Sequence, residues 1–178
     1  IWASPWTPPA WMKINEHYTL RGGDIAGRNG GNEMPERKNV TSNSTAFNMQ
    51  TGYLKAYALY FSKYIQEYKK EGINIWAVMP QNEIAWSPNW PCCTWHSHDL
   101  SHFIGKYLGP QFESDKLNTE IWLGTINFPQ PDYVRDVLKD KDASKYIKGV
   151  GFQWSGEKAI PHISKEYPQI KYMQTENV

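Results

Sequence analysis

Two glutamates stand directly after predicted strands, where carboxylates can take part in chemistry. Glu83 follows an apolar run at 73–79, and Glu176 follows a run at 170–175. They are 176 − 83 = 93 residues apart, which fits about three βα units of roughly 30 residues each. Both would then face one space, where one carboxyl group donates a proton and the other attacks carbon or activates water, as glycosidic bond cleavage requires. Spacing alone leaves open the alternative that both glutamates form structural ion pairs.

The segments that would position these carboxylates alternate between strand-like and helix-like patterns. The predicted strands are 1–4, 73–79, 120–125, 148–153 and 170–175, and the predicted helices are 51–71, 96–108, 131–139 and 159–166. Gly72 is the stop signal of the first helix, and Gly109-Pro110 is that of the second. Residues 13–49 form a long polar stretch without a clear period. The alternation predicts parallel strands joined by helical crossovers, in a barrel or an open sheet.

Polar residues at the C-terminal ends of the predicted strands favour the barrel. They are Ser4, Asn82, Glu83, Asn127, Gln153, Thr175 and Glu176. In an eight-stranded α/β barrel this end carries the active site, and several strands each contribute a residue. An open sheet would focus its site at one switch point, and no Gly-rich phosphate-binding motif follows any strand here. We therefore expect an α/β fold of the (β/α)8 TIM-barrel type.

Composition narrows the range of partners. The net charge of +1 comes from 19 basic and 18 acidic residues interspersed along the chain, so we expect no nucleic acid partner. No apolar run approaches the roughly 18 to 20 residues that span a bilayer, so we expect no transmembrane segment. The chain has 9 tryptophans, more than core packing usually needs. The tryptophans in predicted loops indicate exposed stacking surfaces, and they are Trp6, Trp86, Trp90 and Trp95. Those in predicted strands, Trp76 and Trp122, indicate core positions.

Cysteine and histidine give little support for metal or redox chemistry. Cys92 and Cys93 are adjacent, a placement that rarely allows a mutual disulfide, and we expect partly buried thiols. A second cluster could supply metal ligands, namely His96, His98, Asp99 and His102. Its first two histidines are two residues apart and cannot share a helix face. At a helix start, Asp99 would favour the dipole while the histidines are solvated. We expect neither a metal site nor a cofactor.

Three segments carry a resemblance to a known family. They are residues 3–13 (Ala-Ser-Pro-Trp-Thr-Pro-Pro-Ala-Trp-Met-Lys), residues 76–83 (Trp-Ala-Val-Met-Pro-Gln-Asn-Glu) and Thr175-Glu176. In this order they resemble glycoside hydrolase family 30, which includes glucosylceramidases and β-1,6-glucanases. The first block is long and unusual, whereas an Asn-Glu pair after a barrel strand is shared by a wider clan of glycosidases. The resemblance implies that 1–178 is part of a (β/α)8 catalytic domain, about strand three to strand seven, without the accompanying β-sandwich.

The resemblance also implies roles for individual residues of a retaining enzyme. Glu83 would be the acid/base, Glu176 the nucleophile, and Asn82 a hydrogen-bond donor to the sugar 2-hydroxyl. Trp6 would line the subsite of the sugar being cleaved. The other expected sugar-binding residues are Asn127, Gln153 and Trp154. An acid catalyst must retain its proton, and burial beside a second carboxylate does this by raising its pKa.

One departure from the glucosylceramidase pattern bears on the substrate. In glucosylceramidases the sixth barrel strand ends in His-Trp-Tyr, and the tyrosine contacts the nucleophile. This chain has Gln153-Trp154-Ser155 in that place. A serine is too short to replace the phenol, so the expected carbohydrate substrate is a β-linked glucan, particularly a β-1,6-glucan. A glycolipid such as glucosylceramide is the alternative, and a barrel that binds carbohydrate without catalysis is a further one. Residues 87–95 directly follow the acid/base and would shape the leaving-group side.

The chain start bears on location. The sequence opens with Ile1 in a predicted strand end rather than with Met, so we expect it to be part of a longer protein. Residues 1–178 themselves contain no stretch with the pattern of a signal peptide. We expect a secreted or extracytoplasmic protein.

Overall fold

The protein contains a five-stranded parallel sheet. The structure, a computed structural model, describes residues 1–23 and 32–177. The strands are β1 (Trp2–Ala3), β2 (Ala77–Val78), β3 (Glu120–Ile126), β4 (Ile147–Gln153) and β5 (Lys171–Glu176). They lie in the order β1-β2-β3-β4-β5, and every neighbouring pair is parallel. A doubly wound open sheet reverses its strand order at a switch point, whereas a barrel winds in one direction. The observed order confirms the expected partial (β/α)8 barrel.

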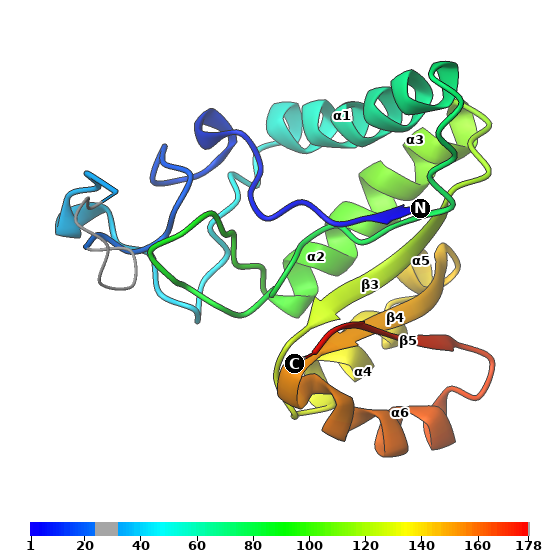
Figure 1. The fold of residues 1–178 in the computed structure, drawn as a ribbon. Coiled ribbons are helices and arrows are strands. Elements are labelled where there is room, and N and C mark those ends of the chain that lie inside the picture. The colour runs from blue at the N-terminus through cyan, green and yellow to red at the C-terminus, as the bar shows by residue number, and fades with distance from the viewer. Residues whose placement is uncertain (24–31, 178) are drawn as a thin grey trace.

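Helices connect each strand to the next. Among the described residues, β1 and β2 are linked by η1 (Ala10–Met12), η2 (Glu36–Lys38) and α1 (Thr51–Lys70), and β2 and β3 by α2 (Ser97–Phe103), the π-helical η3 (Ile104–Leu108) and α3 (Gly109–Ser114). The link from β3 to β4 contains α4 (Asp132–Lys139) and α5 (Lys141–Ser144). The link from β4 to β5 contains η4 (Trp154–Ala159) and α6 (Ile160–Glu166). Figure 1 shows the loops after β1 and β2 gathered on one side of the molecule.

The two faces of the sheet have separate apolar clusters, as barrel strands require. The larger cluster packs β-strand residues such as Val78, Leu123 and Val150 against the helices. The smaller cluster lies on the other face, around Met79 and Trp122. Glycines on β4 make room for these two large side chains, because an added Cβ at Gly149 would lie 2.5 Å from the Trp122 ring and one at Gly151 2.6 Å from Met79 Sδ. Small residues opposite large ones fill a barrel interior in this way.

The second predicted helix extends further than expected. Gly109-Pro110 does not end it, because α2, η3 and α3 run on consecutively from Ser97 to Ser114. A proline inside an α-helix removes one hydrogen bond and clashes with the carbonyl four residues earlier. Here the π-helical turn Ile104–Leu108 comes just before Pro110 and changes the hydrogen-bond spacing at that point. Gly109 is needed for packing, since an added Cβ would meet the Tyr146 ring at 2.2 Å.

Gly105 provides a test of this helical packing. A Cβ at this position would lie 2.8 Å from the Asp142 carbonyl carbon and 2.9 Å from the Ala143 nitrogen, and a backbone cannot move aside as a side chain can. We expect Gly105→Ala to lower the free energy of unfolding by about 1–3 kcal/mol, measured by urea denaturation of the full-length protein. Gly52→Ala in α1 is the matched control, since no atom lies within 4 Å of its added Cβ. Equal stabilities of the two variants would contradict the packing argument.

Several predicted positions differ in detail from the structure. Only Ala77–Val78 of the expected strand 73–79 pairs as a strand, and Trp76 just before it is 36% exposed, although its ring packs edge-on against Trp122. Trp95 was expected to form an exposed surface and is instead 2% exposed, stacked on Phe47 with ring centroids 4.6 Å apart. The loop residue is buried because the segment from 84 to 95 folds back onto the aromatic core. Trp6 and Trp86 are exposed as expected.

A buried lysine ties the loops on the β1 and β2 side together. Lys13 is 1% exposed, and its Nζ donates to Cys92 O at 2.7 Å and to Thr19 O at 3.1 Å. Burial lowers the pKa of Lys13, while burial raises the pKa of Cys92 to about 11 and that of Cys93 to about 12. Both cysteines are buried free thiols. This network holds residues 84–95 against the polar stretch that follows β1, of which residues 24–31 lie outside the described part.

Within 1–23 and 32–177, no helix combines the length and apolar character needed to cross a bilayer.

Candidate active site

The loop after β2 is held against the loop after β1. Asn82 N donates to Pro5 O at 2.9 Å, and Gln81 Nε2 donates to Trp6 O at 2.8 Å. Gln81 is fully buried and Asn82 is 8% exposed, whereas Trp6 is half exposed. The Trp6 segment therefore lies beside the Gln81-Asn82 segment that precedes Glu83.

Glu83 has an unusual backbone conformation. Its φ of 50° lies in the left-handed region, and so does the φ of 51° at Trp154, which follows β4. For residues other than glycine this conformation costs on the order of 1–3 kcal/mol and is found most often at functional sites. Both residues follow strands of the same sheet at its C-terminal edge. Glu16, Glu33 and Lys116 also have a positive φ, so it is the position of Glu83 and Trp154 at this edge of the sheet that sets them apart.

Thr125 in β3 connects the two residues of the Asn-Glu pair. Its hydroxyl oxygen accepts a hydrogen bond from Glu83 N at 2.9 Å, and the hydroxyl donates to Asn82 Oδ1 at 3.1 Å. Thr125 is fully buried. Further backbone hydrogen bonds join the same segments, including Thr125 N to Gln81 O at 2.6 Å. The end of β3 therefore positions Asn82 and Glu83.

The ends of β4 and β5 bring Gln153 beside Glu176. The two residues are Cα partners in the parallel pairing of these strands. Thr175 Oγ1 lies 3.2 Å from Gln153 Oε1 and 3.0 Å from Phe152 O. Gln153 is 1% exposed, whereas Glu176 is exposed. The single proton of the Thr175 hydroxyl has two acceptors within reach, and Gln153 Nε2 has no hydrogen-bond partner among the described residues.

The environment of Glu83 favours its protonated form. Burial raises the pKa of the Glu83 carboxyl group, and the negative charge of Glu176 raises it further. The side chains of Gln153 and Trp154 oppose this rise as nearby donors, although Gln153 Nε2 makes no hydrogen bond of good geometry among the described residues. Both glutamates follow strands at the C-terminal edge of this sheet, and the charge of Glu176 is one of the causes that raise the Glu83 pKa. Within the described residues, neither forms an ion pair with a basic side chain.

Four buried polar atoms at strand ends have no hydrogen-bond partner among the described residues. They are Ser4 Oγ, Gln81 Oε1, Asn127 Oδ1 and Gln153 Nε2. Leaving such groups unpaired costs about 1–3 kcal/mol each. Asn127 is also fixed through its carbonyl, which accepts from Ser155 Oγ at 3.2 Å. A polyhydroxylated ligand can pair with donors and acceptors of this kind.

Two residues of this arrangement were not identified from the sequence. Thr125 lies inside an apolar strand, where a threonine has no feature that distinguishes it from an ordinary strand residue. Gln81 precedes Asn82 directly, and only its burial and its bond to Trp6 O reveal its role. The other expected residues, Asn127, Gln153 and Trp154, all lie at the same edge of the sheet.

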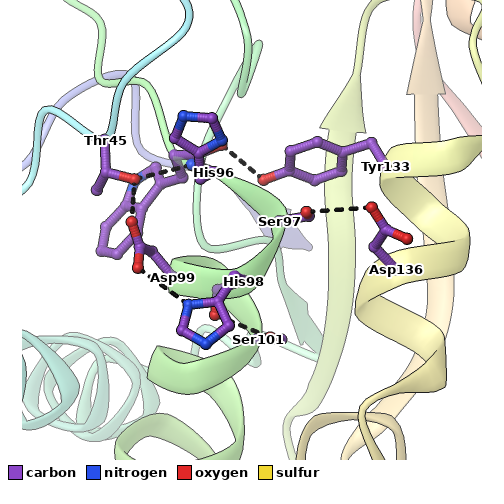
Figure 2. A network of polar contacts seen from close by, with 9 residues as sticks. Thr45, His96, Ser97, His98, Asp99, Ser101, Tyr133 and Asp136 are labelled. Atoms are coloured by element: carbon purple, nitrogen blue, oxygen red, sulfur yellow. Dashed lines mark hydrogen bonds and ion pairs between the residues drawn. The ribbon is translucent and has the colours of Figure 1, made fainter.

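Residues of the histidine cluster form hydrogen bonds between a loop and the start of α2. Figure 2 shows Thr45, from the segment before α1, joined to the start of α2. Thr45 Oγ1 accepts from His96 N at 2.9 Å and bonds to Asp99 Oδ2, while His98 Nδ1 lies 3.3 Å from Asp99 Oδ1. Asp99 Oδ2 therefore docks the loop that carries Thr45 on α2, whereas Asp99 Oδ1 contacts the neighbouring His98 of the same helix. Across the described ranges, no group of three or more His, Cys, Asp or Glu residues is arranged to hold a metal ion.

Comparisons with known proteins agree with this architecture. Residues 1–178 match the family described as the glycosyl hydrolase family 30 TIM-barrel domain. The chain is 35% identical over 153 residues to endo-1,6-beta-D-glucanase neg1 of Aspergillus fumigatus, covering 85% of this chain and 29% of that protein. It is 27% identical over 178 residues to putative glucosylceramidase 3 of Caenorhabditis elegans, covering 95% of this chain and 29% of that protein.

A solved structure shows the same fold. The endo-beta1,6-glucanase BT3312 superposes with a TM-score of 0.74 at 27% identity, covering 97% of this chain and 36% of that one. The chain spans less than a third of the length of the two curated relatives. Sequence motifs, the partial barrel and the family match agree, and the chain belongs to glycosyl hydrolase family 30 as part of its TIM-barrel domain.

Proposed function

We propose that the protein containing this chain is a retaining β-glycoside hydrolase. The observation that carries this proposal is that Glu83 and Glu176 both follow strands at the C-terminal edge of one sheet, where burial and the charge of Glu176 raise the pKa of Glu83. Paired carboxylates with different protonation states are what glycoside hydrolysis uses. The family assignment supports the same reaction class.

The two carboxylates take different roles in a double displacement. The exposed Glu176 side chain acts as the nucleophile at the anomeric carbon, while Glu83 donates its proton to the leaving oxygen. Glu83 then removes a proton from water, which hydrolyses the glycosyl–enzyme ester and regenerates both groups. Asn82 donates a hydrogen bond to the 2-hydroxyl of the bound sugar. Sugar contacts are completed by Trp6, Asn127, Gln153 and Trp154, and no cofactor takes part.

The proposed substrate is a β-1,6-linked glucan. Two of the relatives named above are endo-1,6-glucanases, one at 35% identity and one with a similar barrel. Ser155 turns its hydroxyl to Asn127 O and cannot take the place of a tyrosine beside the nucleophile. Glucosylceramide is the second candidate because the chain aligns over 95% of its length with a putative glucosylceramidase. A polymer of this kind does not cross a bilayer, which supports a secreted or extracytoplasmic location.

Product analysis of the full-length protein tests the proposed function. We expect release of glucose oligomers from pustulan, a β-1,6-glucan, at a rate at least about tenfold above that from laminarin or glucosylceramide, since a mispositioned linkage forfeits about 1.4 kcal/mol or more of transition-state binding. A preference for glucosylceramide would favour the second candidate. Saturable binding of pustulan without hydrolysis of any of the three would leave a carbohydrate-binding barrel, which has no need of two glutamates in one site.

A further inference from the structure

We infer that Thr125 is a positioning residue that fixes the orientation of the Asn82 amide and thereby sets recognition of the sugar 2-hydroxyl. The inference rests on the proposed function, and it concerns a residue to which the sequence motifs assign no role. Thr125 is fully buried in β3, one strand away from the Asn-Glu pair that it contacts. Its hydroxyl is the only side-chain group joining these strand ends that both accepts from one residue of the pair and donates to the other, among the described hydrogen bonds.

The direction of these hydrogen bonds follows from the chemistry of the groups. The backbone N–H of Glu83 can only donate, so the Thr125 oxygen must accept it at 2.9 Å. A hydroxyl has a single proton, and among the described hydrogen bonds its only acceptor is on Asn82, at 3.1 Å. The Asn82 group facing Thr125 must therefore be its carbonyl oxygen.

The hydrogen bond to Asn82 Oδ1 determines which way the Asn82 amide nitrogen points. An amide group carries an acceptor at one end and two donors at the other, so its Nδ2 is turned away from Thr125 and is available to a ligand. Asn82 is also fixed at its backbone by the bond from its nitrogen to Pro5 O. A flipped amide would leave the proton of the Thr125 hydroxyl without an acceptor among the described residues and would present an acceptor to the site. Thr125 thus selects a donor, rather than an acceptor, for the sugar 2-hydroxyl.

The same hydroxyl supports the unusual backbone at Glu83. With φ at 50°, the Glu83 N–H cannot enter a regular strand ladder, and the Thr125 oxygen satisfies it. Removal of the hydroxyl therefore leaves two polar groups without their partner, one on each residue of the pair. This predicts a general loss of activity in addition to the specific loss of 2-hydroxyl recognition, and the two losses are separable by substrate.

The experiment compares an aryl β-glucoside with its 2-deoxy analogue in the full-length enzyme. The quantity measured is kcat/KM for the aryl β-glucoside divided by kcat/KM for its 2-deoxy analogue, which we call the 2-hydroxyl ratio. We expect Thr125→Val, which keeps the shape of the side chain, to lower this ratio by about tenfold or more, because the misoriented amide no longer donates to the 2-hydroxyl. Thr125→Ser retains a hydroxyl and is expected to restore most of the ratio.

Two controls separate positioning from a merely structural role. Thr119→Val removes a hydroxyl that bonds to Ile75 O at 2.8 Å at the other end of β3, and its 2-hydroxyl ratio should equal that of the unaltered enzyme. In an Asn82→Ala background, Thr125→Val should cause no further fall in the ratio, because Thr125 acts through Asn82. Should Thr125→Val not fold, Thr125→Ala provides the same measurement without a branched side chain.

The possible outcomes are distinguishable. Equal losses on both substrates, with an unchanged 2-hydroxyl ratio, would overturn the positioning role and leave Thr125 as a structural residue. An additional fall in the Asn82→Ala background would overturn the assignment of the effect to Asn82. Failure of the unaltered enzyme to hydrolyse any β-glycoside would instead refute the proposed function itself.

Discussion

Replacement of Glu176 by alanine is expected to lower kcat on an aryl β-glucoside by roughly 10⁴- to 10⁶-fold, the range found when a covalent nucleophile is removed. Glu176 ends β5 at the C-terminal edge of the sheet, and its side chain is exposed. Without it, the glycosyl–enzyme ester cannot form. Added azide should enter the space that the carboxylate leaves and displace the aglycone directly. The product is then the α-glycosyl azide, detectable by NMR, because only one inversion takes place.

The matched control is Glu157→Gln, which removes an exposed carboxylate on η4 and should retain activity close to that of the unaltered enzyme. Binding of a glucan oligosaccharide by Glu176→Ala, measured by calorimetry, would show that the fold is intact. Retention of the original kcat, or formation of the β-glycosyl azide, would contradict the nucleophile assignment.

Replacement of Glu83 by alanine is expected to have an effect that depends on the leaving group. For a glucan, whose leaving alcohol needs a proton, kcat/KM should fall by about 10² to 10⁴-fold, as for the loss of a general acid. For 2,4-dinitrophenyl β-glucoside, whose phenolate leaves unprotonated, glycosyl–enzyme formation should be nearly unimpaired. Azide can then attack the accumulated intermediate in place of water. The product should be the β-glycosyl azide, opposite in configuration to that expected for the Glu176 variant.

The pH dependence of the unaltered enzyme provides an independent check of Glu83. A general acid works only while protonated, so kcat/KM must fall as the pH rises through the Glu83 pKa. Burial and the charge of Glu176 raise this pKa, so the basic limb should lie at higher pH than for an ordinary carboxyl group near about 4.3. The basic limb should disappear in Glu83→Ala. A limb that persists unchanged in that variant would mean that another residue is the acid.

The order and type of most elements were predictable because their local patterns are strong. The amphipathic period of α1, the apolar runs of β3 and β4 and the final strand β5 are all local features, and the structure places them within one or two residues of the prediction. Parallel pairing followed from the βαβα order. The residues at the strand ends could also be recognised, since a barrel places its active site there whatever its loops are.

Contacts between distant segments decided the points where local signals were misleading. Gly109-Pro110 is a strong local stop, yet the helix continues because a π-helical turn accommodates the proline and the glycine packs under Tyr146. Trp95 lies in a loop between polar residues, yet it stacks on Phe47 from a segment nearly fifty residues away in sequence. Burial depends on what the rest of the chain brings to a residue, and this information is not local.

For the two glutamates, too, some properties follow from the sequence and others only from the tertiary structure. Their residue types, their position after strands and the neighbouring motifs follow from the sequence alone, and so does membership of the family. Only the tertiary structure shows Gln153 paired with Glu176 across β4 and β5, Glu83 in a left-handed conformation, and Thr125 joining Glu83 to Asn82. The physical reason is that a chemical group is encoded at one position, whereas its pKa and orientation are set by groups that folding brings close from other strands.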